Sequence, residues 1–271
     1  MALFGKLFEK KVCDICGEEI GLLGNRKLED GNCCKACAAK LSPWFDERRH
    51  STVENIREQI EYREENLRQL ESFHTTRTIS SDRFSILLDE DQQKFVVMKN
   101  RTKLLEYNPD ILDFSQVTGA RLDVDSSRHE IMREVKRGDQ TERVSYNPPR
   151  YEYSYDFHYI INVNHPYFDD IRFDLNNSNV EITPAYGGGM IRGTAPQPFD
   201  PSMNPEYQEY ERIGKEITDV LMGARSEARA AKAEEQNPSI VTCPFCGAQT
   251  AVTSSGKCEY CGGYVGPELR G

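Results

Sequence analysis

Residues 13–37 read CDICGEEIGLLGNRKLEDGNCCKAC and contain two cysteine pairs with CxxC spacing. The same spacing recurs twice near the other end of the chain. One CxxC turn aims two sulfur atoms at one ion, and a second turn completes the tetrahedron of thiolates that Zn²⁺ accepts. The sequence therefore predicts two structural zinc sites, whose ligands are Cys13, Cys16, Cys34 and Cys37 in the first and Cys243, Cys246, Cys258 and Cys261 in the second.

The ninth cysteine, Cys33, directly precedes Cys34, so the order of residues leaves open which of the two binds the ion. We assign Cys34 because it keeps the CxxC spacing to Cys37. Disulfides are the alternative use of paired cysteines, and an oxidising compartment would favour them. The first residues show no apolar run long enough for a secretory signal. We therefore expect a cytoplasmic location, in which thiols stay reduced, and a redox role is disfavoured because no strand-helix-strand context surrounds any pair.

The two predicted sites differ in their local sequence. Glycine follows three of the four pairs, at Gly17, Gly247 and Gly262, and allows the positive φ that a zinc knuckle needs. The fourth pair, Cys34 and Cys37, runs into good helix formers, so we expect it to open a helix. With a hairpin turn at 30–32, this order predicts a treble-clef-like module. The domains expected at the two ends are this module over residues 1–49 and a small zinc ribbon over residues 236–271.

The chain has 271 residues, too many for two small zinc modules, so residues 76–235 must bury a core of their own. Apolar and polar side chains alternate over 84–88 and again over 151–157. This period of two predicts antiparallel strands in a twisted sheet or small barrel. The polar stretch ending in Pro148 and Pro149 is expected to separate two of these strands.

Two amphipathic helices flank the predicted sheet. Within residues 50–75 apolar side chains recur three, four, seven and three positions apart, which predicts a helix. Arg63 interrupts its short heptad pattern, so packing on the body is favoured, and self-association into a homo-oligomer is the alternative. Residues 205–235 predict a second helix. Its first half is expected to close the sheet and its alanine-rich second half to extend as a charged stalk. The glycines at 187–189 indicate a loop.

Two resemblances support this organisation. Antiparallel strands closed by a C-terminal helix resemble the pleckstrin-homology-like architecture of bacterial proteins. The first fifty or so residues contain the motifs Cys13-Asp-Ile-Cys16-Gly17, Leu28-Glu-Asp-Gly-Asn32, Cys34-Lys-Ala-Cys37 and Leu41-Ser-Pro-Trp44. These motifs resemble an uncharacterised bacterial family known only as a domain of unknown function. That family implies an intracellular bacterial zinc protein and no particular reaction. The expected fold class is α+β.

Four thiolates fill the coordination sphere of a metal and leave no position for a reacting water, so we expect no enzyme. The net charge of −10 disfavours a polynucleotide partner. The expected function is a non-enzymatic interaction or adaptor protein that binds protein partners. Two alternatives stay open. One is a nucleic-acid-associated zinc-ribbon protein, and the other is a membrane-surface protein without a membrane span that uses its basic amphipathic residues 1–11.

Overall fold

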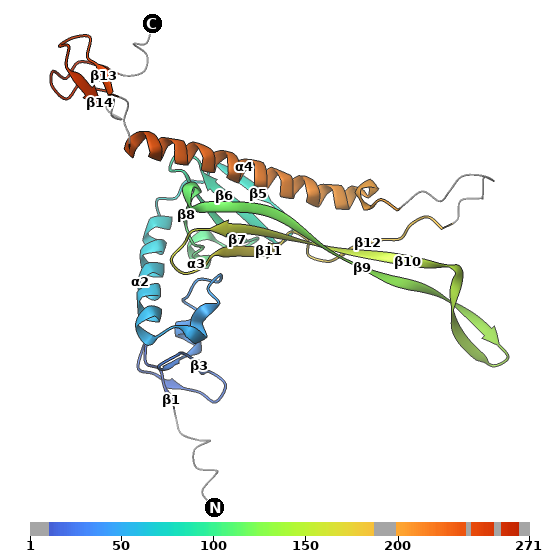
Figure 1. Ribbon diagram of the computed structural model, residues 1–271. Coiled ribbons are helices and arrows are strands. Elements are labelled where there is room, and N and C mark those ends of the chain that lie inside the picture. The colour runs from blue at the N-terminus through green and yellow to red at the C-terminus, as the bar shows by residue number, and fades with distance from the viewer. Residues whose placement is uncertain (1–10, 187–198, 237–239, 252–255, 266–271) are drawn as a thin grey trace, which may run out of the picture.

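The computed structural model describes residues 11–186, 199–236, 240–251 and 256–265. The amphipathic segment at 1–10 and the glycine-rich loop at 187–198 lie outside these residues. The fold is α+β, as predicted. In Figure 1 the N-terminal module lies beside helix α2, two antiparallel sheets form the body, helix α4 lies along the sheets, and the ribbon follows the end of α4. No helix in the described ranges is long and apolar enough to cross a membrane.

The N-terminal module has two short antiparallel hairpins followed by one helical turn. Its elements are β1 Lys11–Val12, β2 Glu19–Ile20, β3 Arg26–Lys27, β4 Asn32–Cys33, α1 Lys35–Ala38 and the 3-10 helix η2 Glu47–His50. Its small core includes the buried side chains of Ile20, Leu28 and Leu41. Ile56 and Ile60 from the following helix complete that core. The treble-clef-like order of knuckle, hairpin and helix is therefore present.

Helix α2 (Val53–Leu70) begins at Thr52, which forms a capping box with Asn55. The helix buries Arg63, whose Nη1 lies 2.7 Å from Oδ1 of the buried Asp110. The hydroxyl of Ser42 donates to the other oxygen of Asp110 at 2.7 Å. Arg63 interrupts the heptad pattern because it forms this ion pair, which connects the helix, the end of the N-terminal module and the body.

The body consists of two antiparallel sheets of four strands each. The first contains β5 Arg77–Ser80, β6 Phe84–Asp89, β7 Lys94–Lys99 and β8 Leu112–Asp113, in that order. The second contains β9 Val117–Arg137, β10 Gln140–Val163, β11 Asp170–Asp174 and β12 Val180–Ile182. In it β10 is central, with β9 on one edge and both β11 and β12 on the other. Short helical turns α3 Leu104–Tyr107 and η3 Phe114–Gln116 flank β8.

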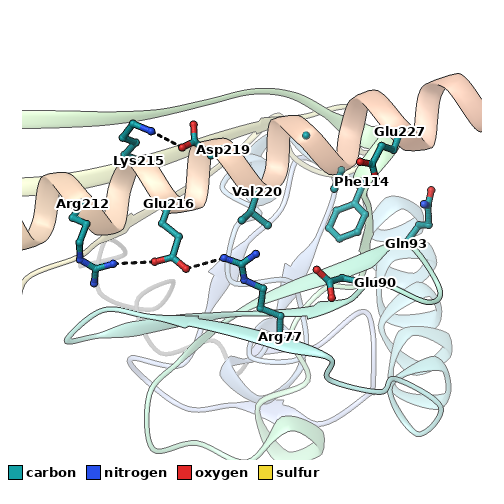
Figure 2. Close-up of a pocket in the computed structure, with 12 residues that line it drawn as sticks. Arg77, Glu90, Gln93, Phe114, Arg212, Lys215, Glu216, Asp219, Val220 and Glu227 are labelled. Carbon is teal, nitrogen blue, oxygen red and sulfur yellow. Dashed lines mark hydrogen bonds and ion pairs between the residues drawn. The ribbon is translucent and has the colours of Figure 1, made fainter.

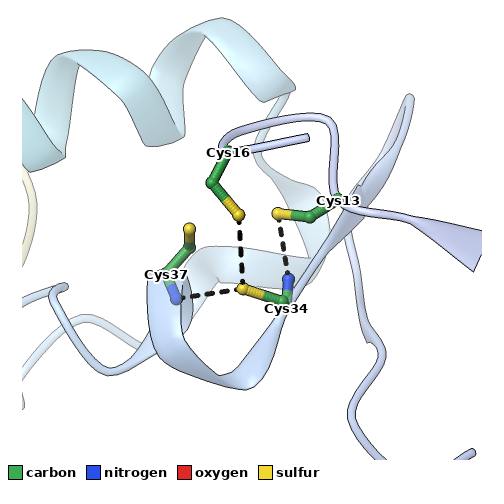
Figure 3. A group of neighbouring side chains, drawn as sticks. All are labelled: Cys13, Cys16, Cys34 and Cys37. Atoms are coloured by element: carbon green, nitrogen blue, oxygen red, sulfur yellow. Dashed lines mark hydrogen bonds between the residues drawn. The ribbon is translucent and has the colours of Figure 1, made fainter. Parts of the chain in front are cut away.

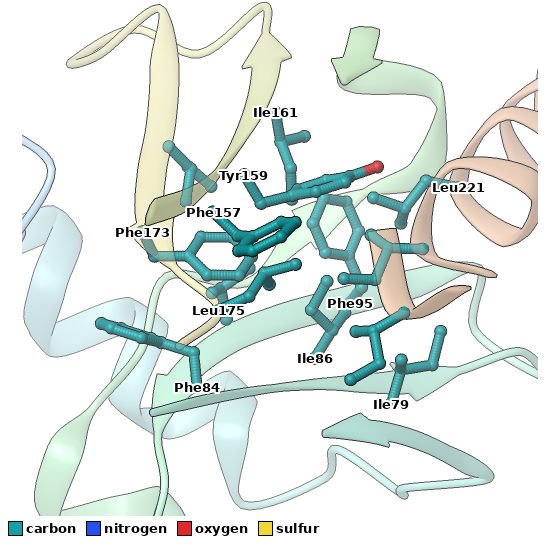
Figure 4. Packing of buried hydrophobic residues seen from close by; sticks show 14 of the residues in the cluster. Ile79, Phe84, Ile86, Phe95, Phe157, Tyr159, Ile161, Phe173, Leu175 and Leu221 are labelled. Atoms are coloured by element: carbon teal, nitrogen blue, oxygen red, sulfur yellow. The ribbon is translucent and has the colours of Figure 1, made fainter. Parts of the chain in front are cut away.

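The core of the body lies between the two sheets and is rich in aromatic side chains (Figure 4). Phe157 and Tyr159 from the second sheet are fully buried, as is Phe95 from the first. Leu221 of α4 covers the same core. The hydroxyl of Tyr159 lies 2.7 Å from Oγ1 of Thr218, which satisfies its polar end against the helix. The alternating apolar side chains predicted over 84–88 and, within the predicted 151–157, those from Tyr153 to Phe157 therefore face one shared core, whereas Tyr151 lies outside it.

Strands β9 and β10 continue beyond the core as a long hairpin (Figure 1), which we call the arm and define as residues 125–150. The prediction that the polar stretch ending at Pro148 and Pro149 separates two strands is wrong, because both prolines lie within β10. The register shifts between Ser145 and Arg150, so the prolines, which lack an N–H group, occupy an irregularity that needs no ladder hydrogen bond from them.

Helix α4 (Pro205–Gln236) follows the 3-10 turn η4 Pro201–Met203, and its first half packs on the body as predicted. The packing continues further than predicted. Ala228 is also buried, and the Arg229 guanidinium donates to the carbonyl oxygens of Ser115 and Val117. The small alanine side chains let the helix approach η3 closely, so the expected stalk does not begin before residue 230.

The C-terminal ribbon is built from β13 Ile240–Thr242 and β14 Gln249–Ala251, which pair antiparallel. A bridge between Lys257 and Tyr264 forms a second, shorter hairpin. Val265 and two of the cysteines make its small core.

Candidate metal centres

The first centre brings together the four predicted N-terminal ligands, Cys13, Cys16, Cys34 and Cys37 (Figure 3). Their sulfur atoms all lie within 4.8 Å of one another, and the Sγ atoms of Cys16 and Cys34 are 3.8 Å apart. A tetrahedral ion with metal–sulfur bonds of about 2.3 Å requires sulfur–sulfur edges of about 3.8 Å. The donor set and its spacing therefore fit one four-coordinate metal ion.

The backbone of a knuckle and of a helix start positions these sulfur atoms. Gly17 adopts a φ of 78° and donates its N–H to the carbonyl of Cys13 at 2.8 Å, which closes the knuckle after β1. Cys34 is the N-cap of α1, and its sulfur accepts the N–H of Cys37 at 3.3 Å. Burial alone would raise the pKa of Cys13. The amides of Cys16, Cys34 and Ile15 outweigh burial and lower the pKa of Cys13 to about 6, whereas burial and the neighbouring sulfur atoms raise the pKa of Cys37.

Cys33 lies outside this group. Its side chain is fully buried in the module core, and its Sγ donates to the carbonyl of Cys34 at 3.4 Å. Burial, together with the nearby Cys13 and Cys34 sulfurs, raises the pKa of Cys33 to about 12. Successive residues of a strand point to opposite faces, so Cys33 faces the core when Cys34 faces the sulfur cluster.

The second centre brings together Cys243, Cys246, Cys258 and Cys261 within the same 4.8 Å limit. The distance between sulfur atoms is 3.6 Å for Cys243 and Cys261 and 3.7 Å for Cys246 and Cys258.

Each half of the second centre is a knuckle. The N–H groups of Gly247 and Gly262 donate to the carbonyls of Cys243 and Cys258, and both glycines have a φ near that of Gly17 (74° and 73°). Three of the four CxxC turns therefore share one backbone geometry.

The arrangement of both centres limits their chemistry. Each offers four sulfur donors, which matches a soft or borderline metal ion in tetrahedral coordination and fills every position around it. A catalytic centre of this geometry keeps one position for water or substrate. Both groups can hold metal ions, and their donor sets are compatible with zinc.

Two histidines of the body are hydrogen-bonded within the fold. Nδ1 of His158 lies 2.7 Å from Oδ1 of Asp174, on the face of β10 opposite the core. His165 is buried against Phe168, and its Nε2 lies 2.9 Å from the hydroxyl of Tyr62 on α2. Burial lowers the pKa of His165 to about 4, so this side chain is neutral at pH 7. Sequence patterns did not indicate the contact with Tyr62, because the two residues are distant in the chain.

A hollow of about 870 Å³ lies between α4 and the first sheet (Figure 2). Arg77 of β5 contacts Glu216 at 2.9 Å, and Arg212 contacts the other oxygen of Glu216 at 3.1 Å. Lys215 likewise contacts Asp219 at 2.6 Å. The basic side chains that line the hollow are thus already paired with carboxylates of α4. Arg77 connects this helix to the edge strand β5.

Comparison with known proteins adds one match. A family model described as a domain of unknown function (DUF4428) matches residues 11–59, which cover the N-terminal module and the first turns of α2. The similarity of the first fifty or so residues to an uncharacterised family is confirmed. No curated protein and no solved structure matches the chain.

Proposed function

We propose that this chain is a non-enzymatic zinc protein that binds protein partners, with one structural zinc ion in each four-cysteine centre. The closed thiolate coordination supports structural zinc, because small modules of this kind gain most of their folding free energy from the metal. A cytoplasmic location is part of the proposal, since reduced thiols are needed to bind the ions. We also propose that the two sheets and α4 form a pleckstrin-homology-like body.

The observation that carries the interaction role is the arm. No side chain from Asp125 to Arg150 is buried. The pairing of β9 with β10 nevertheless continues along the arm, from the Val124–Phe157 pair to the Arg137–Gln140 pair. An isolated two-stranded hairpin is marginal in water, because it has no core to offset its ordering entropy. A paired hairpin that contributes nothing to the core of its own domain is suited to present residues to another molecule.

Cation–π contacts between arginine and tyrosine side chains on the surface of the arm stabilise its paired strands. The guanidinium of Arg150 lies over the Tyr146 ring, 4.2 Å from its centroid, and Arg128 lies 4.7 Å from the centroid of Tyr151. Arginine and tyrosine are the residue types enriched where proteins bind one another, since each combines a large contact area with polar groups. The half-buried Val135 and Val144 and the exposed Met132 add apolar surface near the tip.

An arm-deleted variant tests the proposal. Arg128 and Tyr153 are paired across the two strands, so residues 129–152, which comprise most of the arm and the two residues that follow it, can be replaced by an Asn-Gly turn without a change of register. We expect two metal ions per chain and a free energy of unfolding within about 1 kcal/mol of the parent, because no buried side chain is removed.

A photo-crosslinking amino acid at Met132 in the full chain then reports on contacts made in cells. A probe at the comparably exposed Leu105 on the body is the matched control. We expect a discrete crosslinked protein from position 132 and not from position 105, and loss of that protein from affinity-purified samples of the arm-deleted variant. Retention of the same partner by the arm-deleted variant would contradict the proposal.

A further inference from the structure

The most exposed large apolar side chains among the described residues are two neighbours in the N-terminal module. Leu22 is 87% exposed and Leu23 is 93% exposed. The residues that flank their loop, Ile20 and Leu28, are buried at 8% and 1% exposure. The module therefore has an apolar core within reach of this loop, and the two leucines do not contribute to it.

A hydrogen-bonded turn holds the leucines outward. The N–H of Gly24 donates to the carbonyl of Gly21 at 2.9 Å, so Leu22 and Leu23 are the two central residues of a β-turn. The guanidinium of Arg26 donates to the carbonyl of Leu23 at 3.3 Å. The leucines are thus exposed on an internally hydrogen-bonded turn.

Basic side chains lie close to this turn, and Arg26 contacts it. Arg26, Lys27, Arg48 and Arg49 line one hollow of about 710 Å³, with Glu29 as the acidic residue among its lining side chains. Arg48 donates to the carbonyl of Lys27 at 2.9 Å, which places η2 beside β3. The chain as a whole carries a net charge of −10, so this concentration of positive charge stands against the overall balance.

We infer that the Leu22–Leu23 turn and the basic side chains near it dock the N-terminal module on an anionic lipid bilayer. An exposed pair of apolar side chains on a turn can enter a deformable apolar phase, and the cations near the turn would then lie at the level of the headgroups. Each Lys or Arg near an anionic membrane adds a modest attraction, and one short apolar contact is also weak, so the two act together.

A nucleic acid would use the cations and leave the leucines in water, because phosphate groups attract only the charged side chains. An acidic protein is the other alternative, and the test distinguishes it. The inference goes beyond the proposed function and does not involve the arm, so either can fail without the other. It also differs from the expectation based on residues 1–11, because it assigns the contact to described residues of the folded module.

The test is sedimentation of the zinc-loaded full chain with vesicles of phosphatidylcholine, alone or mixed with phosphatidylglycerol. We expect binding to the mixed vesicles and not to phosphatidylcholine alone. Changing both leucines to serine should weaken the partition at least about tenfold, from the apolar transfer that is lost. The matched control changes two exposed apolar residues of the body, Leu105 and Met203, to serine and should bind like the parent.

The charge requirement is tested with Lys27→Gln and Arg49→Gln together, which should weaken binding about thirtyfold. The control is Lys99→Gln with Arg101→Gln, an equal change of charge on the body. Metal content and hydrogen exchange of residues 11–50 verify that each variant is folded.

Three outcomes would overturn the inference. The first is a parent chain that does not bind mixed vesicles. The second is a leucine variant that binds as the parent does while the charge variant does not, which would show that the cations alone adsorb to the anionic lipid and that the leucines do not enter the bilayer. The third is binding that disappears only when residues 1–10 are deleted.

Discussion

The neighbouring cysteines at 33 and 34 provide the sharpest contrast that the structure predicts. Cys34→Ala removes one of four metal ligands, whereas Cys33→Ala removes a thiol from the module core. We expect the first change to release one metal ion and unfold the N-terminal module, and the second to leave both ions bound. The two variants change neighbouring residues and each removes one thiol group, so each serves as the control for the other.

The magnitudes follow from the size of the module core. Its buried aliphatic side chains are Ile20, Leu28 and Leu41 together with Ile56 and Ile60 of α2, and full burial of each stabilises by about 1.5–3 kcal/mol. Ordering the backbone costs about 1–2 kcal/mol per residue, far more than these side chains return over a module of this length. A structural zinc ion contributes about 10–16 kcal/mol in small modules. The module therefore depends on its metal, while Cys33→Ala should cost about 1–2 kcal/mol for a small cavity.

The assay combines metal analysis of the dialysed protein with hydrogen exchange followed by mass spectrometry. Cys34→Ala should hold one ion per chain, with fast exchange over residues 11–50 and unchanged protection over 84–99. Cys33→Ala should hold two ions with the module still protected. Loss of metal from Cys33→Ala, or two ions and a protected module in Cys34→Ala, would refute the assignment of ligands.

Three further changes test the packing of the body. Asp110→Ala leaves Arg63 buried without its carboxylate and should lower the free energy of unfolding, measured with urea, by about 3–5 kcal/mol. Arg63→Met in the same chain should restore most of that loss. A loss below about 1 kcal/mol would contradict a buried ion pair. His165 binds a proton near pH 6.5 when unfolded and only near pH 4 when folded, so the unfolded state binds more protons in this window and stability falls as pH falls through it. His165→Phe should reduce that loss by about 2 kcal/mol, after a discount for solvent screening, and an unchanged pH profile would exclude this cause. Ala228→Glu places a charge in the helix interface and should destabilise by about 2–4 kcal/mol, whereas Ala233→Glu at an exposed position of the same helix should have little effect; equal effects would show that the helix does not pack at Ala228.

Short-range patterns predicted those parts of the fold that depend on neighbouring residues. The CxxC spacing and the following glycines anticipated the knuckles, because φ at Gly17, Gly247 and Gly262 is set by the turn itself. Alternation over 84–88 anticipated β6, because the first sheet buries one face of that strand. The spacing of Cys34 to Cys37 identified the member of the Cys33–Cys34 pair that lies in the sulfur cluster.

The features that sequence patterns missed depend on contacts between distant residues. The arm has no buried face, so its strands lack the alternation that marks β9 and β10 near the core, and Pro148 and Pro149 resemble a break. Arg63 interrupts a heptad pattern, and only the fold brings Asp110 to it. The exposed Leu22 and Leu23 look like core residues in the sequence, and their exposure follows from the turn between Gly21 and Gly24.

The most direct test of the central claim is X-ray absorption at the zinc edge of the purified full chain, together with its metal content. Two closed four-thiolate centres predict two zinc ions per chain and a first shell of four sulfur atoms at about 2.3 Å. Nitrogen or oxygen in that shell at about 2.0–2.2 Å would indicate an open centre. That result, or zinc in only one of the two groups, would contradict the account.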